Sequence, residues 1–361
     1  MLEKRIMECL KQVREPETGQ DLISANRIKD ITADDQNIRI TLMLPGLQVK
    51  YKDLLYQACY DAVSQVFPHH EVHVHFEVAG VNAKSNQTTV PQIKHIIAIA
   101  SGKGGVGKST VAVNLALALK KQGLSVGLMD ADLYGPSVPM MLGVQGHRPK
   151  VEQIMGEAKI VPLLAQGMPV MSIGFIIEPE QAVVLRGPRL AGIIKQFLTD
   201  CLWPTLDVLV IDLPPGTGDI QLTLVQTVPV SGAVMVTTPQ NVAVADAVKA
   251  ANMFLLPNVN VPILGVIENM SWFTPAELPD KKYFIFGQGG GNQLAHFCNT
   301  NVLAQIPLVQ KVREGGDLGK PVVGHNEDVA DYFISAAKKL WAQLELRQST
   351  LPPTQRVNIQ M

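Results

Sequence analysis

The segment SGKGGVGKST, residues 101–110, constrains the fold of this chain more than any other feature. It matches the phosphate-loop pattern G-x-x-x-x-G-K-[ST] through Gly102, Gly107, Lys108 and Ser109. The apolar run HIIAIA precedes it and a helical stretch follows, which is the strand–loop–helix context that this pattern requires. Glycines let backbone N–H groups converge on phosphate oxygens, and the helix N-terminus adds partial positive charge. The segment therefore predicts a nucleotide-binding α/β domain.

The phosphate loop also predicts individual contacts to ATP and Mg²⁺. Lys108 is expected to contact the β- and γ-phosphates, and the Ser109 hydroxyl is expected to bind Mg²⁺. The alternative, an ordinary glycine-rich turn, does not account for the coincidence of pattern and context. GTP is the competing nucleotide, but the sequence has no NKxD motif, which favours ATP. The loop residues expected to line the nucleotide are Gly102, Gly104, Gly105, Val106, Gly107, Lys108, Ser109 and Thr110.

Three aspartates follow later strands and complete a site for phosphoryl transfer. Asp130 and Asp132 lie in MDADLYGPS, and Asp212 lies in DLPPGTGD. Because ligands gather at the carboxyl ends of parallel strands, these segments are expected to meet at one edge of the sheet. We expect Asp212 to hold Mg²⁺ through water, with Asp130 near the Mg²⁺ shell, and Asp132 to orient the attacking water. The alternative for each aspartate is a helix cap.

Two further residues are candidates for nucleotide contacts. Gly216, in DLPPGTGD, could donate its N–H to the γ-phosphate and act as a switch. Asn269 follows the apolar run ILGVIE, and its amide could pair with the edge of adenine. Its alternative role is a turn or capping asparagine. The segment 306–317, IPLVQKVREGGD, is expected beside Asn269.

The alternation of strands and helices predicts the fold class. From residue 93, short apolar runs alternate with helical stretches, which indicates an α/β domain with a doubly wound, mostly parallel sheet. The strands are expected at 95–100, 125–130, 206–213, 232–238 and 263–269, and the helices at 108–122, 241–253 and 327–347. The first eighty residues form a small α+β unit, with helices at 2–13 and 51–66 and strands at 38–44 and 71–78. The predicted organisation is a small domain (1–80), a linker (81–93), the P-loop domain (94–347) and a loose tail (348–361).

Composition excludes several classes of protein. The 361 residues carry a net charge of −1, which argues against a wholly basic nucleic-acid binder. No nucleic-acid partner is therefore expected. No apolar run approaches the ~20 residues of a membrane span, so no membrane contact is expected. The N-terminus does not resemble a signal peptide, and the expected location is the cytoplasm. His73 and His75 share one face of a strand and could suit a metal, but an exposed strand face is the preferred interpretation.

Taken together, the motifs resemble those of one family. SGKGGVGKST, DADLYGPS, RGP (186–188), DLPPGTGD, TTPQNVAVAD, ENMSWF and IPLVQKVREGGD are similar to the motifs of the Mrp/ApbC iron–sulfur cluster carrier ATPases, over about residues 95–330. VREPETGQDLIS, residues 13–24, resembles the signature of the small domain that precedes such ATPases. The resemblance implies a homodimer that binds and hydrolyses ATP and transfers a [4Fe–4S] cluster from iron–sulfur scaffolds to recipient apoproteins. In the related MinD, ParA and nitrogenase iron-protein class, a lysine at the position of Lys103 reaches the nucleotide of the partner subunit. The resemblance therefore implies a catalytic role for Lys103 beside Lys108 and Asp132, and the alternative for Lys103 is a solvated loop lysine.

The sequence departs from the family pattern after ENMSWF. Family members carry a CxxC pair there, whereas TPAELPDKKYFIFG, residues 274–287, contains no cysteine. Cys201 and Cys298 are the only cysteines of the ATPase region, and each is expected to be a buried hydrophobe in a helix. The cluster ligands are therefore unknown, and the cluster would be bound by unusual ligands or held by a partner. Two other functions stay open: a nucleotide-gated adaptor and a positioning ATPase of the MinD or ParA type.

Overall fold

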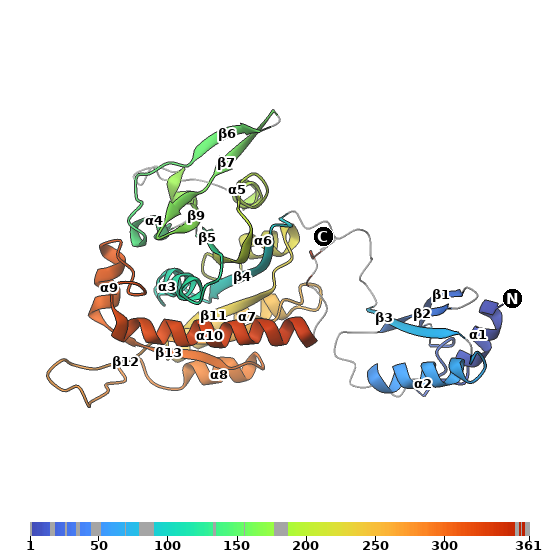
Figure 1. Ribbon diagram of the computed structural model, residues 1–361. Coiled ribbons are helices and arrows are strands. Elements are labelled where there is room, and N and C mark those ends of the chain that lie inside the picture. Colours follow the sequence, from blue (N-terminus) through green and yellow to red (C-terminus); the bar gives the residue numbers. More distant parts are fainter. Residues whose placement is uncertain are drawn as a thin grey trace. The chain divides into compact units, whose positions relative to one another are not determined.

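A computed structural model gives the structure of the chain in two compact units, Met1–Asn86 and Gln87–Met361 (Figure 1). Each unit is described by itself. The structure describes residues 2–14, 19–25, 27–33, 37–44, 52–68, 70–78, 90–132, 135–154, 156–176, 187–350, 354 and 356–357. Most of the predicted linker (81–93) therefore lies outside the described residues, and so does Arg186 of the RGP motif.

The first unit is a three-stranded sheet with two helices. Its strands β1 (Ile28–Ala33), β2 (Asn37–Leu44) and β3 (Glu71–Val78) lie in that order, with β1 antiparallel and β3 parallel to β2. Helix α2 (Lys52–Ser64) connects the parallel pair and packs with α1 (Leu2–Leu10). The alternating strand patterns and both helices are confirmed. Strand β1 was not predicted, because its sequence IKDITA has no buried apolar run.

The histidines of β3 lie where an exposed strand face was predicted. His75 is exposed and His73 is half-exposed, with its Nε2 3.6 Å from Glu71 Oε1. Within the described part of the chain, no three His, Cys, Asp or Glu side chains come together as a metal site.

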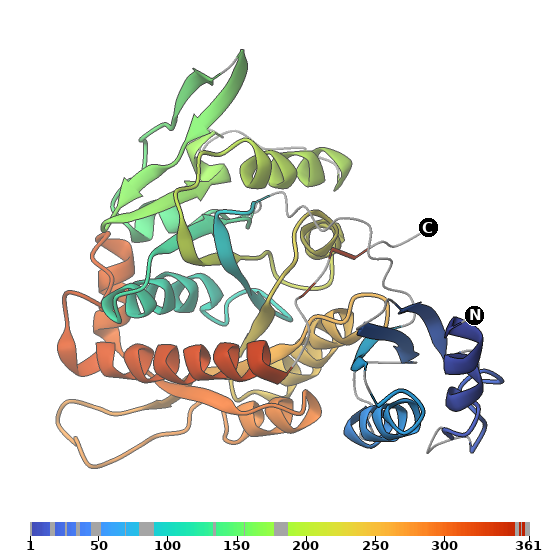
Figure 2. The ribbon, with the colours of Figure 1, turned by 45° about the vertical axis from the view of Figure 1, so that its right-hand side comes forward.

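The second unit is built on an eight-stranded sheet of order β13-β12-β11-β4-β10-β5-β9-β8 (Figures 1 and 2). Every neighbouring pair is parallel except β8 with β9, which confirms the doubly wound, mostly parallel prediction. The strands are β4 (Ile93–Ser101), β5 (Val126–Asp130), β8 (Leu163–Ala165), β9 (Met168–Ser172), β10 (Leu206–Asp212), β11 (Gly232–Thr237), β12 (Ile263–Phe273) and β13 (Val302–Leu308).

Helices cover both faces of this sheet. Helices α3 (Lys108–Lys121) and α10 (Glu327–Thr350) pack side by side on one face (Figure 2). The other face carries α5 (Gly187–Thr199), α6 (Asp219–Thr227), α7 (Asn241–Leu255) and α8 (Gly290–Phe297). Every residue of β5 and β11 is buried, which explains why the strands read as unbroken apolar runs.

Two short helices, a β-hairpin and a 3-10 turn complete this unit. Helix α4 (Val138–Met141) packs against α9 (Gln310–Asp317), and β6 (Lys150–Ile154) forms an antiparallel hairpin with β7 (Glu157–Val161). A short 3-10 turn, η1 (Ile173–Phe175), follows β9. The hairpin was not predicted, because all residues of β6 are exposed and its sequence has no apolar alternation.

The expected helical placement of two cysteines was wrong. Cys201 does not lie in a helix: α5 ends at Thr199, and Cys201 forms an isolated bridge with Ile160. Cys298 caps α8 rather than continuing it, because Asn299 follows with a left-handed φ of 51°. The tail was expected to be loose, but Val357 is buried and its N–H donates to Val225 O over 3.0 Å. No helix in the described ranges is long and apolar enough to cross a membrane.

Candidate functional site

The phosphate loop joins β4 to α3 and is shaped by its glycines. Gly105 and Gly107 have φ values of 81° and 80°, which side-chain-bearing residues rarely adopt. A Cβ on Gly102 would overlap the backbone of Asp246 in α7. The loop is therefore held closely against α7, and its backbone at Gly105 and Gly107 turns as a phosphate cradle requires.

Asn269 braces this loop from β12. Its Nδ2 donates a hydrogen bond of 2.9 Å to Val106 O, and a Cβ on Gly107 would overlap the same nitrogen. In register, Asn269 pairs with Ile306 of β13, so the segment from 306 does lie beside it. The structure thus gives Asn269 a role in holding the loop, and its assignment to the adenine edge stays a prediction.

Lys108 is clamped between two carboxylates. Its Nζ lies 2.7 Å from Asp212 Oδ1 and 3.3 Å from Asp132 Oδ2, and 3.4 Å from Ser109 Oγ. The lysine is only 6% exposed, and Asp212 is fully buried. The structure therefore brings together the lysine, the serine and two of the aspartates singled out from the sequence.

Strand register places the third aspartate beside them. Asp212 ends β10 and pairs with Asp130, which ends β5. Asp130 accepts hydrogen bonds from Ser172 Oγ over 2.9 Å and from Asp132 N over 3.1 Å. Asp130 thus fixes the backbone of Asp132. Ser172 was not predicted as a site residue. It ends β9, whose short sequence MPVMS did not indicate a strand.

Burial dominates the electrostatics of the cluster. Desolvation and the neighbouring Asp212 raise the pKa of Asp130 to about 8, and desolvation also raises the pKa of Asp212, although Lys108 opposes the shift. Burial by itself would lower the pKa of Lys108, but the carboxylates of Asp212 and Asp132 outweigh it and the pKa is raised. The lysine is therefore held as a cation against the carboxylates.

The oxygen atoms here fit a magnesium ion. Among the described residues, Asp212 Oδ2 is a buried oxygen with no hydrogen-bond partner. A buried carboxylate oxygen without a partner is unfavourable by itself and would gain from a cation or a metal-bound water. Ser109 Oγ lies in the same cluster. Mg²⁺ usually completes its shell with phosphate oxygens and water, so hydroxyl and carboxylate donors of this kind suit it.

Gly216 turns the segment after β10. Its φ is 91°, and its N–H donates to Ser101 O over 2.9 Å. The Gln221 side chain, at the start of α6, donates to Pro214 O and Gly216 O over 2.9 and 3.1 Å. Gly216 would have to exchange its present contact to reach a γ-phosphate, so its switch role stays a prediction.

Lys103 lies within the loop and is partly exposed. The Ser101 hydroxyl donates to Lys103 O over 3.1 Å, which fixes the backbone at this position. Its action on the nucleotide of a second protomer stays a prediction.

All four cysteines are buried thiols. Desolvation raises the pKa of Cys59 and of Cys201 to about 12, and that of Cys298 to about 11. A thiolate is the form that binds iron. The burial of Cys201 and Cys298 agrees with the prediction that each is a small core hydrophobe.

Two family models and many curated proteins match this chain. The family model of the NUBPL iron-transfer P-loop NTPases matches residues 92–341, and that of an iron–sulfur cluster assembly protein matches residues 3–76. A protein named iron–sulfur cluster carrier protein from Synechocystis is 44% identical over 88% of this chain and 90% of its own length. One of the same name from Haemophilus influenzae is 41% identical over 97% of this chain and 94% of its own.

Solved structures give the same fold. A nucleotide-binding protein from Archaeoglobus fulgidus, in complex with ADP, is 37% identical, with a TM-score of 0.57, over 67% of this chain and 93% of its own. The cell division ATPase MinD from Pyrococcus furiosus is 24% identical, with a TM-score of 0.50, over 69% of this chain and 99% of its own.

Proposed function

The chain belongs to the iron–sulfur cluster carrier family of P-loop NTPases, and on that premise we propose that it is an ATPase that works as a homodimer to deliver clusters to recipient apoproteins. The single observation that carries the ATPase role is Lys108, clamped between Asp212 and Asp132 at the end of a glycine-shaped loop. This arrangement provides a cation for phosphate and carboxylates for metal and water.

Nucleotide binding exchanges the partners of Lys108. The β- and γ-phosphates replace the two carboxylates around its Nζ, while the loop N–H groups and the start of α3 bind phosphate oxygens. Asp212 and Asp132 are then released from the lysine. Mg²⁺, held by Ser109 and through water by Asp212, with Asp130 near its shell, would neutralise charge on the phosphates.

In hydrolysis, Asp132 orients a water molecule towards the γ-phosphorus. The water oxygen forms a bond to phosphorus, the bond to the β–γ bridging oxygen breaks, and the water proton passes to Asp132 or to a phosphate oxygen. Asp130, braced by Ser172, positions Asp132 for this step. Lys103 of the second protomer adds positive charge near the transferred phosphoryl group, as an arginine finger does.

The cluster itself is cargo. The buried thiols with raised pKa do not favour ligation by the cysteines of this fold. The cluster is therefore held by other ligands or stays on a scaffold partner while the ATPase acts. A nucleotide-gated adaptor, the second candidate, is favoured by the same observation.

Anaerobic reconstitution of the full chain with iron and sulfide tests the carrier role. Iron bound per dimer and visible absorption would be measured, and phosphate release from ATP would be followed in the same preparation. Stoichiometric iron with absorption in the visible region supports a directly bound cluster, and hydrolysis without iron supports action on a partner's cluster. Nucleotide-dependent partner binding with no phosphate release would favour the adaptor and contradict the ATPase proposal.

A further inference from the structure

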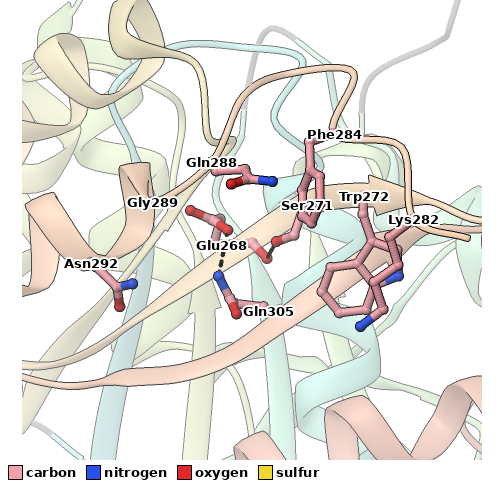
Figure 3. A pocket seen from close by; sticks show the side chains of 9 residues that line it. All are labelled: Glu268, Ser271, Trp272, Lys282, Phe284, Gln288, Gly289, Asn292 and Gln305. Atoms are coloured by element: carbon pink, nitrogen blue, oxygen red, sulfur yellow. Dashed lines mark hydrogen bonds between the residues drawn. The ribbon is translucent and has the colours of Figure 1, made fainter.

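A cavity of about 360 Å³ lies beside the carboxyl ends of β12 and β13, at the start of α8. Figure 3 shows Glu268 in its middle, with Trp272, Lys282 and Phe284 grouped at one end and Asn292 at the other. Glu268 and Asn269 are successive residues of one strand, so their side chains point to opposite faces. Asn269 reaches the phosphate loop, and Glu268 reaches this cavity. The cavity is therefore separate from the phosphate site.

Glu268 is a buried carboxylate held by neutral donors. It is 1% exposed, and its Oε2 accepts from Gly291 N over 2.6 Å while its Oε1 accepts from Gln305 Nε2 over 2.8 Å. Among the described residues, no lysine, arginine or histidine forms an ion pair with it. A carboxylate can accept about four hydrogen bonds, so each oxygen has a free lone pair. The first turn of α8 contributes the N–H of Gly291 to this carboxylate.

The other end of the cavity already accepts a cation. Lys282 Nζ lies 4.1 Å from the centroid of the Trp272 ring, a cation–π contact. Tyr332 of α10 packs edge-on against the same ring, with centroids 6.2 Å apart, and holds it in place. Lys282 itself is exposed, so this cation can be displaced into water at little cost. The Trp272 and Phe284 rings suit the flat face of a guanidinium.

Exposed apolar side chains continue from the cavity on the surface. Three consecutive residues, Tyr283, Phe284 and Ile285, are 45%, 43% and 60% exposed. Tyr283 is joined to Phe273 by an isolated antiparallel bridge, which fixes this segment on the end of β12. These three residues form an apolar shelf beside the cavity. A polypeptide could cover this shelf with the side chains next to its cationic residue, whereas a free small cation would leave it exposed.

We propose that this cavity binds an arginine side chain of a partner polypeptide, with the guanidinium paired to Glu268 and stacked between Trp272 and Phe284. The amides of Gln288, Asn292 and Gln305 and the Ser271 hydroxyl, all lining the cavity, offer oxygen acceptors for the remaining N–H groups. The flanking residues of the partner lie on the apolar shelf, against Tyr283 and Ile285. This site goes beyond ATP hydrolysis and cluster transfer, because it uses none of the groups that contact the nucleotide.

The test compares two peptides on the full-length protein by calorimetry. Acetyl-Gly-Leu-Arg-Leu-Gly-amide carries the guanidinium, and the same peptide with citrulline replaces it by a neutral isostere. We expect the arginine peptide to bind at least about tenfold more tightly, and Glu268→Gln to abolish this preference. Glu277→Gln is the matched control, because Glu277 is an exposed carboxylate of the same segment that does not line the cavity.

Further measurements separate this proposal from folding defects and from the nucleotide site. Phe284→Ala alters an exposed wall without touching the buried hydrogen bonds, and it should also weaken binding of the arginine peptide. ATP affinity should stay unchanged in all three variants, so loss of the peptide preference and loss of ATP binding are distinguishable. Equal affinity for the two peptides, or equal effects of the two glutamate substitutions, would overturn the proposal. So would dissociation of a homodimer by the arginine peptide, since the cavity would then be filled by a second copy of this chain.

Discussion

Replacing Lys108 by alanine should destabilise the nucleotide-free protein as well as prevent ATP binding. The substitution removes the cation 2.7 Å from Asp212, which is 0% exposed, and 3.3 Å from Asp132, which is 9% exposed. Breaking a buried ion pair on one side leaves an uncompensated charge and costs about 3–5 kcal/mol. We therefore expect the free energy of unfolding of this unit to fall by that amount at neutral pH.

Urea unfolding followed by tryptophan emission measures this loss in the relevant unit alone. All three tryptophans, Trp203, Trp272 and Trp341, lie in the second unit. Lys94→Ala is the matched control, because Lys94 pairs with Asp207 over 2.6 Å but its side chain is 65% exposed. Asp207 also accepts from Ser125 N, so this loss should stay below about 1 kcal/mol.

A second substitution and a binding measurement complete the test. Asp212→Asn in the Lys108→Ala background removes the orphaned charge, so it should recover part of the lost stability. ATP affinity should fall at least about a hundredfold, because charge-assisted bonds to two phosphates contribute roughly 1.5–3 kcal/mol each. A loss of stability in Lys108→Ala no larger than that in Lys94→Ala, or an unchanged affinity for ATP, would contradict the role assigned to Lys108.

Three further predictions follow from the same geometry. Lys103→Ala should leave ATP affinity within about twofold while lowering phosphate release at least about tenfold, and wild-type turnover would remove the lysine from the catalytic step. Gly102→Ala should displace the loop from the Asp246 backbone of α7 and lower ATP affinity, measured by calorimetry; unchanged affinity would show that the loop tolerates the shift. Iodoacetamide should label Cys201 and Cys298 in the folded protein only slowly at pH 8, since about one thiol in a thousand or fewer is ionised there, and the rate should rise with pH towards the raised pKa of each. Mass spectrometry follows the labelling, and fast modification without urea would contradict the burial of these thiols.

The central architecture was predictable from the sequence because its strands are buried on both faces. Apolar runs such as LDVLVID and GAVMVT, each followed by a helix, indicate buried strands of a parallel sheet. The hairpin of β6 and β7 was not predictable, because its exposed residues have no apolar period. The helix expected through Cys201 was wrong for another reason. The helical pattern of the sequence continues through this residue, but α5 ends at Thr199 and Cys201 pairs instead with Ile160, which is far from it in the sequence.

The candidate site was predictable in its residues and less so in its contacts. The cluster of Lys108, Asp132 and Asp212 was predicted from the phosphate-loop motif and from the rule that ligands lie at the carboxyl ends of parallel strands. The bracing roles of Ser172 and Asn269 depend on which strands are neighbours, which spacing along the chain does not specify. The cavity at Glu268 could not be predicted either, because Gln305 and Gly291 contact Glu268 from two other elements, β13 and α8.

The pairing of Asp130 with Asp212 at the last position of two neighbouring strands has a consequence for sequence change. One residue inserted into β5 or β10 would turn an aspartate to the opposite face of the sheet and bring an apolar neighbour, such as Met129 or Ile211, in its place. These strands therefore cannot vary in length without loss of the nucleotide site. The segment 274–287, which leaves the sheet at the end of β12 and returns before α8, has no such restriction. A change in segment 274–287, such as the absence of a cysteine pair or the presence of a binding pocket, therefore leaves the nucleotide site intact.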